Sequence, residues 1–276
     1  MTGWPRASHW LTMDSDDPAA LVVAGVPLTD HAVTPSRYEL APTAVRARMA
    51  KLSTWHGTRH VALEDVAVRD LGDSLRPPPL RAPLTVLLGG HNGVTHAALA
   101  SVAALGSWGL LTLDAHHDVR PYEPGAVGNG SPVRALIDAG LPPANVIQVG
   151  ISGFSNARAH YEWCVERGVT VLGPDRLADV PALLDGLAQR CSAIYVDVDL
   201  DVLDRAFAPA CPGARPGGAH PRQVLDAAFA AGAHPAVRAI DIVEVDPTAD
   251  VADVTVDAAA LTLLNAAAGF GTRWTG

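Results

Sequence analysis

Hydrophobic residues come in short runs from about residue 20 onward, and longer amphipathic, Ala-rich stretches separate these runs. This alternation is typical of β-α repeats that build a mostly parallel sheet. The predicted strands span residues 21–27, 84–90, 108–116, 146–152, 169–173, 193–200 and 237–245. The predicted helices span residues 43–55, 93–105, 131–140, 156–168, 221–232 and about 250–268. We therefore predict an α/β fold: a single three-layer α-β-α domain over residues 1–276 with a mostly parallel sheet.

Polar residues follow the predicted strand at 108–116, in the order Asp114, His116, His117 and Asp118. Successive side chains of an extended chain alternate, so Asp114, His116 and Asp118 point to one side and His117 to the other. Open α/β sheets bind their ligands at the carboxyl ends of such strands. Two carboxylates and an imidazole at this position predict a metal site, with solvated loop residues as the alternative.

A second cluster, in which Asp197, Asp199 and Asp201 share a face, ends another apolar strand. Buried carboxylates this close together destabilise the fold unless cations neutralise them. A calcium loop of the EF-hand kind is excluded, because Val202 and Ala208 stand where its glycine and bidentate glutamate belong. Two such strands predict two metal ions, and oxygen-rich ligation favours Mn²⁺ over Zn²⁺.

The predicted strand at 84–90 ends in Gly89-Gly90-His91-Asn92 before a helix. The glycines permit a tight turn, and the Lys-Ser/Thr of a phosphate-binding loop is missing. Either His91 or Asn92 would complete the metal shell; a purely structural turn is the alternative.

Composition narrows the class of protein. The formal net charge is −9, and no basic cluster suited to nucleic acid or membrane surfaces is present. We find neither an apolar run of membrane-spanning length nor a secretory leader, so we predict a cytoplasmic protein that acts on a small molecule. Cys164, Cys191 and Cys211 are predicted to be reduced structural thiols. His160 and the other histidines outside the clusters are predicted to be surface or packing residues.

Four motifs together resemble those of the ureohydrolases, the family of arginase, agmatinase and formimidoylglutamase. They occur in the family's order, and the resemblance covers roughly residues 20–268. It implies the predicted fold, and a closed homo-oligomer. The motifs are Gly89-Gly90-His91-Asn92, Asp114 to Asp118, Asp199 to Pro209 with Pro216-Gly217-Gly218, and Asp241 to Pro247.

The resemblance also implies two Mn²⁺ ions per chain, bridged by Asp114 and Asp199. One ion would be held additionally by His116 and Asp201. Asp201 would relay a proton to the departing nitrogen, and Glu244 would hold the cationic group of the substrate.

The second ion would be held by Asp118 and by Asn92, at a position that is His in the family. An amide oxygen is a weaker, neutral ligand, so we predict that this ion is weakly bound. Ligation by His91 after a one-residue shift is the alternative. The role of Asp197 stays open.

The loop after the first cluster resembles the formimidoylglutamase branch, because Asn129 stands where arginases and agmatinases place a proton-shuttling His. The Asp118-x-Arg120 sequence and the pair Ser155-Asn156 also resemble that branch. Either Arg120 or Arg134 would clamp a carboxylate of the substrate. The predicted substrate-binding residues are Arg120, Asn129, Ser131, Arg134 and Glu244.

These residues predict metal-activated hydrolysis of an amidine or guanidine C–N bond, with formimidoyl-glutamate as the first substrate candidate. An arginine-derived guanidine, such as arginine, an agmatine-like amine or Nω-hydroxyarginine, is the alternative within this class. A single-Zn deacetylase and a non-catalytic binding protein are alternatives of other classes. The surplus carboxylates Asp118 and Asp201 speak against the deacetylase.

Overall fold

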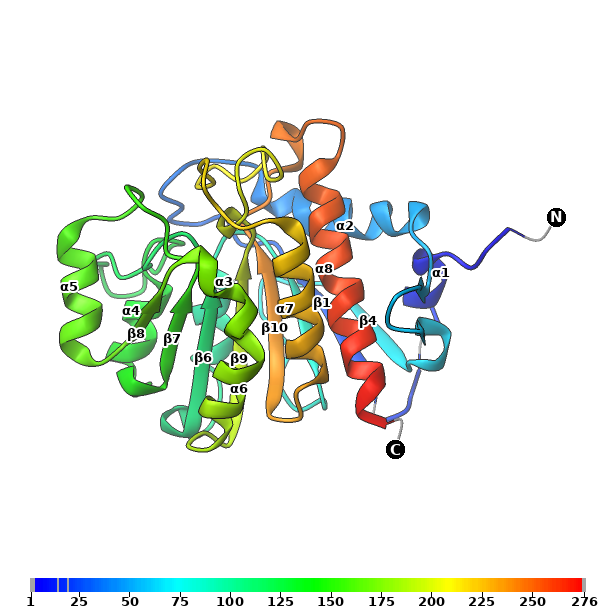
Figure 1. Cartoon of the computed structure of the whole chain (residues 1–276), viewed down its shortest axis with the longest axis horizontal. Helices are drawn as coiled ribbons and strands as arrows, with labels where there is room; N and C mark the ends of the chain where they lie inside the picture. Colours follow the sequence, from blue (N-terminus) through cyan, green and yellow to red (C-terminus); the bar gives the residue numbers. More distant parts are fainter. Residues whose placement is uncertain (1–2, 14, 19, 275–276) are drawn as a thin grey trace.

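The computed structural model describes residues 3–13, 15–18 and 20–274, and one large sheet runs through its centre (Figure 1). Among these residues, eight strands form the sheet in the order β4-β1-β5-β10-β9-β6-β7-β8, and every neighbouring pair is parallel. Each predicted strand is present. The strands are β1 Leu21–Val26, β4 Val68–Asp73, β5 Thr85–Gly89, β6 Trp108–Leu113, β7 Val146–Val149, β8 Thr170–Leu172, β9 Ala193–Asp199 and β10 Val237–Val243.

The edge strand β4 was not predicted, because its sequence VRDLGD lacks an apolar run and most of it is solvent-exposed. Two short antiparallel strands, β2 Trp55–His56 and β3 Val61–Ala62, were not predicted either. Residues 76–83, the Pro-rich stretch, connect β4 to β5 without a helix or strand of their own.

Helices cover both faces of the sheet (Figure 1). The six predicted helices are present, and several are shorter than predicted; for example, α2 gives way to a 3₁₀ turn at Met49–Lys51. Two helices, α1 and α6, were not predicted, and in α6 the residues Pro181 and Gly186 hide the helical pattern. The helices are α1 Ala7–Leu11, α2 Ala41–Arg48, α3 Gly93–Leu99, α4 Pro132–Asp138, α5 Arg158–Arg167, α6 Val180–Ala188, α7 Pro221–Ala233 and α8 Val254–Gly271.

Alternation along the strands divides the core into two apolar layers. In β5, Val86 and Leu88 belong to the cluster shared with α2, α6, α7 and α8, whereas Leu87 belongs to the cluster shared with α3, α4 and α5. Successive residues of a strand face opposite sides, so a strand covered on both sides must be apolar throughout. The predicted three-layer arrangement is confirmed.

Helices α7 and α8 pack closely because glycines stand at their contact. A Cβ on Gly232 would lie 2.0 Å from the Ala266 carbonyl oxygen, and one on Gly269 would lie 2.0 Å from that of Phe229. Helix α8 is long and apolar enough to span a membrane by length and composition alone, but 67% of it is buried inside the protein. It serves here as a core helix.

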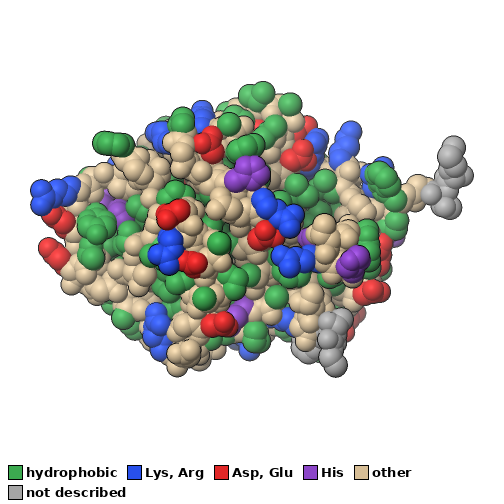
Figure 2. Space-filling view, viewed as in Figure 1, with side chains coloured by type: hydrophobic (Ala, Val, Ile, Leu, Met, Phe, Trp, Pro, Cys, Tyr) green, Lys and Arg blue, Asp and Glu red, His purple; other side chains and the backbone are tan. Residues whose placement is uncertain are grey.

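The face formed by α6, α7 and α8 carries acidic and basic side chains intermingled (Figure 2). On α7, for example, the Arg222 Nε lies 2.9 Å from an Asp226 carboxylate oxygen. Charges on this face therefore tend to have neighbours of opposite sign.

The topology brings four strand ends together. Strands β5, β10, β9 and β6 are adjacent in the sheet, and all are parallel, so their carboxyl ends meet at one edge. The ends of these strands and the residues that follow them contain all four motifs of the sequence. This edge holds the candidate site.

Candidate metal centre and active site

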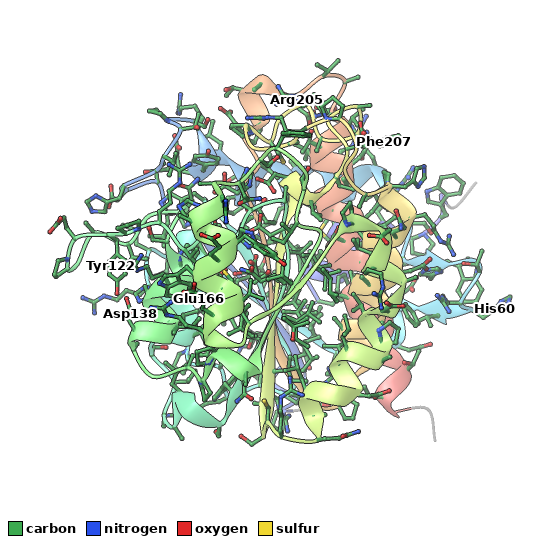
Figure 3. The ribbon with its side chains drawn as sticks, turned by 60° about the vertical axis from the view of Figure 1, so that its left-hand side comes forward. His60, Tyr122, Asp138, Glu166, Arg205 and Phe207 are labelled. Atoms are coloured by element: carbon green, nitrogen blue, oxygen red, sulfur yellow. The ribbon has the colours of Figure 1, made fainter. Side chains whose placement is uncertain are left out.

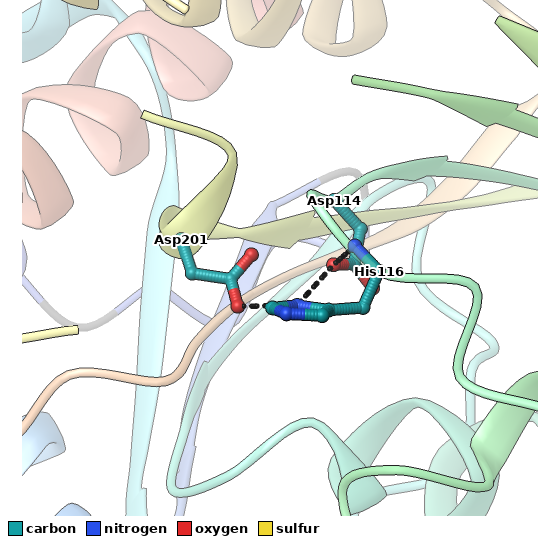
Figure 4. Close-up of side chains that lie close together, drawn as sticks. All are labelled: Asp114, His116 and Asp201. Atoms are coloured by element: carbon teal, nitrogen blue, oxygen red, sulfur yellow. Dashed lines mark hydrogen bonds and ion pairs between the residues drawn. The ribbon is translucent and has the colours of Figure 1, made fainter. Parts of the chain in front are cut away.

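The first group of ligand-type atoms comes from the ends of β6 and β9: Asp114, His116 and Asp201 (Figure 4). Their three ligand atoms lie within 4.8 Å of one another. The Nδ1 of His116 is 2.8 Å from Asp201 Oδ2 and 3.6 Å from Asp114 Oδ1. The other Asp201 oxygen accepts the backbone N–H of Ala115 at 3.1 Å. The backbone therefore fixes the Asp201 carboxylate while its second oxygen faces the imidazole.

The second group shares Asp114 and adds Asp118 and Asp199. Asp118 has a left-handed backbone (φ 52°), which turns its side chain back toward the strand ends. Asp199 Oδ1 accepts the backbone N–H of Asp201 at 2.8 Å. Among the described residues the two groups thus have one carboxylate in common, as a pair of neighbouring cations would require.

The ionisation of these groups reflects burial without a neutralising charge. Burial, with the neighbouring Asp201 carboxylate, raises the pKa of Asp114 to about 7. Burial and nearby carboxylates also hold the pKa of Asp118 and of Asp199 well above the ordinary value. Burial by itself would lower the pKa of His116, but the Asp201 and Asp114 carboxylates outweigh this effect and raise it to about 11. Against the effect of burial, His116 lowers the pKa of Asp201.

This donor set fits divalent cations. It offers buried carboxylate oxygens with one imidazole nitrogen, and its excess negative charge has too few basic partners to offset it. Hard, oxygen-rich sites of this kind suit Mg²⁺ or Mn²⁺.

Asn92, rather than His91, lies beside these carboxylates. Its Nδ2 donates to Asp118 Oδ2 at 2.9 Å and to Asp114 Oδ2 at 3.4 Å. His91 is buried on another side: one ring nitrogen lies 2.7 Å from the Asp30 carbonyl oxygen, and the other accepts the Gly93 N–H at 2.9 Å. Both nitrogens of His91 are therefore engaged away from the carboxylates.

Gly90 permits this turn. A Cβ there would lie 2.1 Å from the carbonyl oxygen of Leu28, so only glycine lets the two backbones approach this closely. The sequence interpretation of the glycines as a tight turn agrees with this contact.

Glu244 follows β10 and has a left-handed backbone (φ 70°). Its Oε1 accepts the Asn92 backbone N–H at 2.8 Å and the Asn129 side-chain N–H at 2.9 Å. Burial raises the pKa of Glu244 to about 7, against the effect of these two hydrogen bonds. Asn129 Oδ1 in turn accepts the Val33 N–H at 2.8 Å. Asn129 thus ties Glu244 to a neighbouring loop.

Above these residues opens a cavity of about 360 Å³, a size that suits a small molecule. Two loops frame it, residues 119–131 after β6 and residues 204–220 before α7; Figure 3 shows Tyr122 of the first loop and Arg205 and Phe207 of the second. The lining residues that carry polar or charged side chains are Thr34, Tyr38, His116, Asp118, Arg120, Asn129, Ser155, Asn156, His160, Asp199, Asp201, Arg215 and Glu244.

Two predicted substrate residues lie outside the lining. Arg134 points along α4, where its guanidinium lies 5.4 Å from the Trp163 ring centre and 3.8 Å from Asp138. Ser131 is buried at the start of α4 and does not line the cavity. For Arg134, these contacts direct the side chain away from the strand ends.

Sequence reasoning missed Thr34 and Tyr38, which line the cavity, and also two basic cavity residues, His160 and Arg215. His160 on α5 was predicted to be a surface or packing residue, yet it lines the cavity. Arg215 lies in the long loop before α7, and its Nη1 donates to the carbonyls of Pro212, Gly213 and Ala214 at 2.9 to 3.2 Å. Neither residue has a local pattern that would have revealed it. Cys164, Cys191 and Cys211 are free and buried, as predicted.

A second polar layer lies beneath the carboxylates. Asp197 on β9 pairs in register with Asp241 on β10, and both are fully buried. Asp241 Oδ2 accepts hydrogen bonds from Thr95 at 2.7 Å and Tyr195 at 2.8 Å. Asp197 thus lies below the first carboxylates and belongs to neither ligand group.

Fold and site together define a three-layer α/β protein with a carboxylate-rich centre for divalent metal at the strand ends. The sequence model described as "Arginase family" matches residues 74–269, and the chain belongs to this family. It is thereby one of the arginase-family hydrolases.

Formimidoylglutamases are among its relatives. That of Bacillus subtilis (strain 168) is 32% identical over 287 residues, which cover 94% of this chain and 89% of the relative. That of Halalkalibacterium halodurans is 33% identical, with 87% and 84% covered. The crystal structure of the B. subtilis formimidoylglutamase superimposes with a TM-score of 0.88 at 28% identity, covering 98% of this chain and 93% of that one. A Trypanosoma cruzi formiminoglutamase solved with Mn²⁺ has a TM-score of 0.86 at 20% identity, covering 98% and 100%, and supports the fold alone.

Proposed function

We propose that this protein hydrolyses N-formimidoyl-L-glutamate to formamide and L-glutamate, using two Mn²⁺ ions. Water adds to the amidine carbon, the bond from that carbon to the glutamate nitrogen breaks, and that nitrogen gains a proton. The observation that carries the proposal is one cavity that combines a carboxylate-rich metal centre with two arginines, Arg120 and Arg215. The formimidoylglutamases among its relatives support the choice of substrate.

The two ions would be held by the two ligand groups that share Asp114. His116 and Asp201 would complete one site. Asp118 and Asn92 would complete the other. Asp199 would be a ligand shared by the two sites, as the sequence resemblance implies. Bound divalent ions lower the pKa of water and so provide a nucleophile at neutral pH. Two groups with a common carboxylate favour this arrangement over the single-Zn alternative.

Glu244 is placed to hold the amidine. It lines the cavity, and its Oε1 is fixed by two N–H donors, so the carboxylate has little freedom to turn. A carboxylate in this position would pair with the cationic amidine and orient its carbon before attack. Asn129 supports Glu244 through its amide and does not titrate, so it cannot shuttle a proton.

Asp201 is the candidate for proton transfer. Asp201 lines the cavity, and its Oδ1 accepts the Ala115 backbone N–H at 3.1 Å, so the carboxylate is held where it can accept a proton from the attacking water. That proton would pass to the departing nitrogen of glutamate.

The arginines suit the two carboxylates of a glutamate derivative. The Arg120 guanidinium has no ion-pair or hydrogen-bond partner among the described residues, and it packs over Gly130, where a Cβ would lie 2.7 Å from its Cδ. In Arg215 the loop carbonyls engage Nη1, which leaves the rest of the fork for a ligand. A guanidinium can clamp a carboxylate with two parallel hydrogen bonds. Ser155, whose buried hydroxyl has no partner in the described part of the chain, adds a further polar group.

A substrate panel tests this function. Purified protein with Mn²⁺ would be incubated with N-formimidoyl-L-glutamate, N-formimidoylglycine, L-arginine and agmatine, and formamide and urea would be measured. We expect formamide from the glutamate derivative with the highest kcat/KM. Preferred release of urea would support the guanidine alternative, and no turnover of any substrate would support a binding protein. We further propose a homo-oligomer, as the sequence resemblance implies, and a cytoplasmic location, as the sequence analysis predicts.

A further inference from the structure

The polar layer beneath the metal centre contains a hydrogen-bond conflict at Thr95 on α3. Its Oγ1 lies 2.8 Å from Asn92 Oδ1 and 2.7 Å from Asp241 Oδ2. Both neighbours are oxygen acceptors, and a hydroxyl has only one proton to donate. Thr95 therefore cannot satisfy both contacts in the orientation that the Asn92 amide has here.

Asp241 is the stronger acceptor for the Thr95 hydroxyl proton. It is a fully buried carboxyl group, and the Tyr195 hydroxyl already donates to the same oxygen at 2.8 Å. Its Oδ1 accepts the Val198 backbone N–H at 3.3 Å. A hydrogen bond to a carboxylate is about twice as strong as one to an amide oxygen. If Thr95 donates to Asp241, its lone pairs face Asn92.

The Asn92 amide can turn to meet them. A half-turn about its Cβ–Cγ bond exchanges Oδ1 and Nδ2 with little change in shape. The Nδ2 now donates toward oxygens of Asp114, Asp118 and Asp197 at 2.9 to 3.4 Å. After the half-turn it would donate to Thr95, and Oδ1 would take its place among the carboxylates. With a cation beside Oδ1, every polar group of the chain from Asn92 through Thr95 to Asp241 would then have a suitable partner.

We propose that Thr95 is a positioning residue that turns the oxygen of Asn92 toward the metal. In the orientation described above, the NH₂ group faces the carboxylates and offsets part of their charge. In the turned orientation the oxygen would face the cation, and the chain from Asn92 to Thr95 to Asp241 would hold it there. This inference rests on the proposed metal-dependent function. It extends that function by explaining how a neutral amide obtains the fixed orientation that a metal ligand requires.

The test measures metal binding rather than turnover. Mn²⁺ binding to wild type and to Thr95→Val, which keeps the shape and removes the hydroxyl, would be followed by equilibrium dialysis with metal analysis. We expect the weaker site to lose about 10- to 100-fold in affinity, the usual effect of removing a group that orients a ligand. The stronger site should change little, and Thr95→Ser should bind as wild type does. If the valine of Thr95→Val disturbs packing, Thr95→Ala removes the hydroxyl without adding a methyl group and serves as the second variant.

A double-mutant cycle separates positioning from general destabilisation. If Thr95 acts through Asn92, adding Thr95→Val to Asn92→Leu should cost no further affinity. Thr262→Val, which removes another buried helix hydroxyl that donates to the Ala258 carbonyl oxygen, is the matched control and should bind normally. Thermal unfolding of each metal-free variant checks the fold.

The outcomes distinguish the two claims. A wild type that binds no Mn²⁺ would overturn the proposed function and this inference with it. A wild type that binds two ions, together with a Thr95→Val isotherm equal to it, would overturn only the role of Thr95. An equal further loss in the Asn92→Leu background would also overturn it, because Thr95 would then not act through Asn92.

Discussion

At the scale of single residues, position 92 sets this site apart. A neutral amide stands among Asp114, Asp118 and Asp197, and its N–H group contacts all three. The amide adds no negative charge to a cluster that already carries an excess, but it is a weaker ligand than imidazole. The site is thus built around carboxylates, and Asp114, which belongs to both groups, should matter most.

We therefore expect Asp114→Asn to lose both metal ions and to lower kcat/KM by at least about 100-fold, more than the loss of an outer-shell partner costs. The substitution keeps the shape of the side chain and removes its charge. Metal analysis after dialysis, together with an activity assay, measures both effects. Asp138→Asn, a change on the exposed end of α4, is the control. Retention of two ions by Asp114→Asn would refute the shared-ligand assignment.

Removing single arginines should have different effects on KM. Truncating Arg120 or Arg215 to alanine should raise KM for N-formimidoyl-L-glutamate about 10- to 150-fold, because a hydrogen bond to a charged group contributes roughly 1.5–3 kcal/mol. Arg134→Ala should leave KM unchanged, since Arg134 contacts Trp163 and Asp138 outside the cavity. Steady-state kinetics of the three variants measures these KM values. A KM increase confined to Arg134→Ala would reverse the assignment.

At the scale of elements, the helices α7 and α8 depend on glycine for their contact. Gly269→Ala would drive a methyl group against the Phe229 carbonyl, so we expect it to lower the free energy of unfolding by about 1–3 kcal/mol. Gly186→Ala in α6, where a Cβ meets nothing within 4 Å, should instead raise it by about 0.5–1 kcal/mol. Urea unfolding curves of the two variants test the pair. A neutral Gly269→Ala would show that the helices separate without cost.

The sequence predicted the elements whose neighbours impose a strong pattern. Central strands such as β5, β6 and β9 are apolar because both faces are covered, and their polar ends stand out against that background. The edge strand β4 and helix α6 lack such a contrast. The parallel topology also explains why Asp114 and Asp199 come together although they are far apart along the chain.

Residues placed only by tertiary contacts could not be predicted in this way. Arg215 reaches the cavity through a long loop, and the link from Thr95 to Asp241 joins two separate elements. Arg134 failed as a cavity residue because the direction of α4, rather than its distance from the first cluster, determines where its side chain points. Whether Asn92 ligates a metal stays a prediction, although the structure places it beside the carboxylates.

At the scale of the whole molecule, burying so many carboxylates makes the stability of the metal-free protein depend on pH. Burial raises the pKa of Asp114 from 3.8 to about 7 and that of Glu244 from 4.5 to about 7. The folded chain therefore keeps protons that the unfolded chain releases between these values. This stabilisation is complete below the unfolded pKa and is lost as the pH rises through the folded pKa.

We thus expect the free energy of unfolding of metal-free protein to fall by a few kcal/mol between about pH 4 and pH 7. Urea unfolding in the presence of a chelator at several pH values measures it. Combining Asp114→Asn with Glu244→Gln should reduce the pH dependence, because these two side chains no longer titrate. A stability that rises over this range would contradict the assigned shifts.

The measurement that tests the central claim most directly is a reconstitution. Metal-free protein would receive increasing Mn²⁺, and the rate of formamide release from N-formimidoyl-L-glutamate would be followed together with bound metal. The account predicts that the rate rises until two Mn²⁺ ions are bound per chain and then levels off. Full activity with one bound ion, or no formamide with two ions bound, would contradict it.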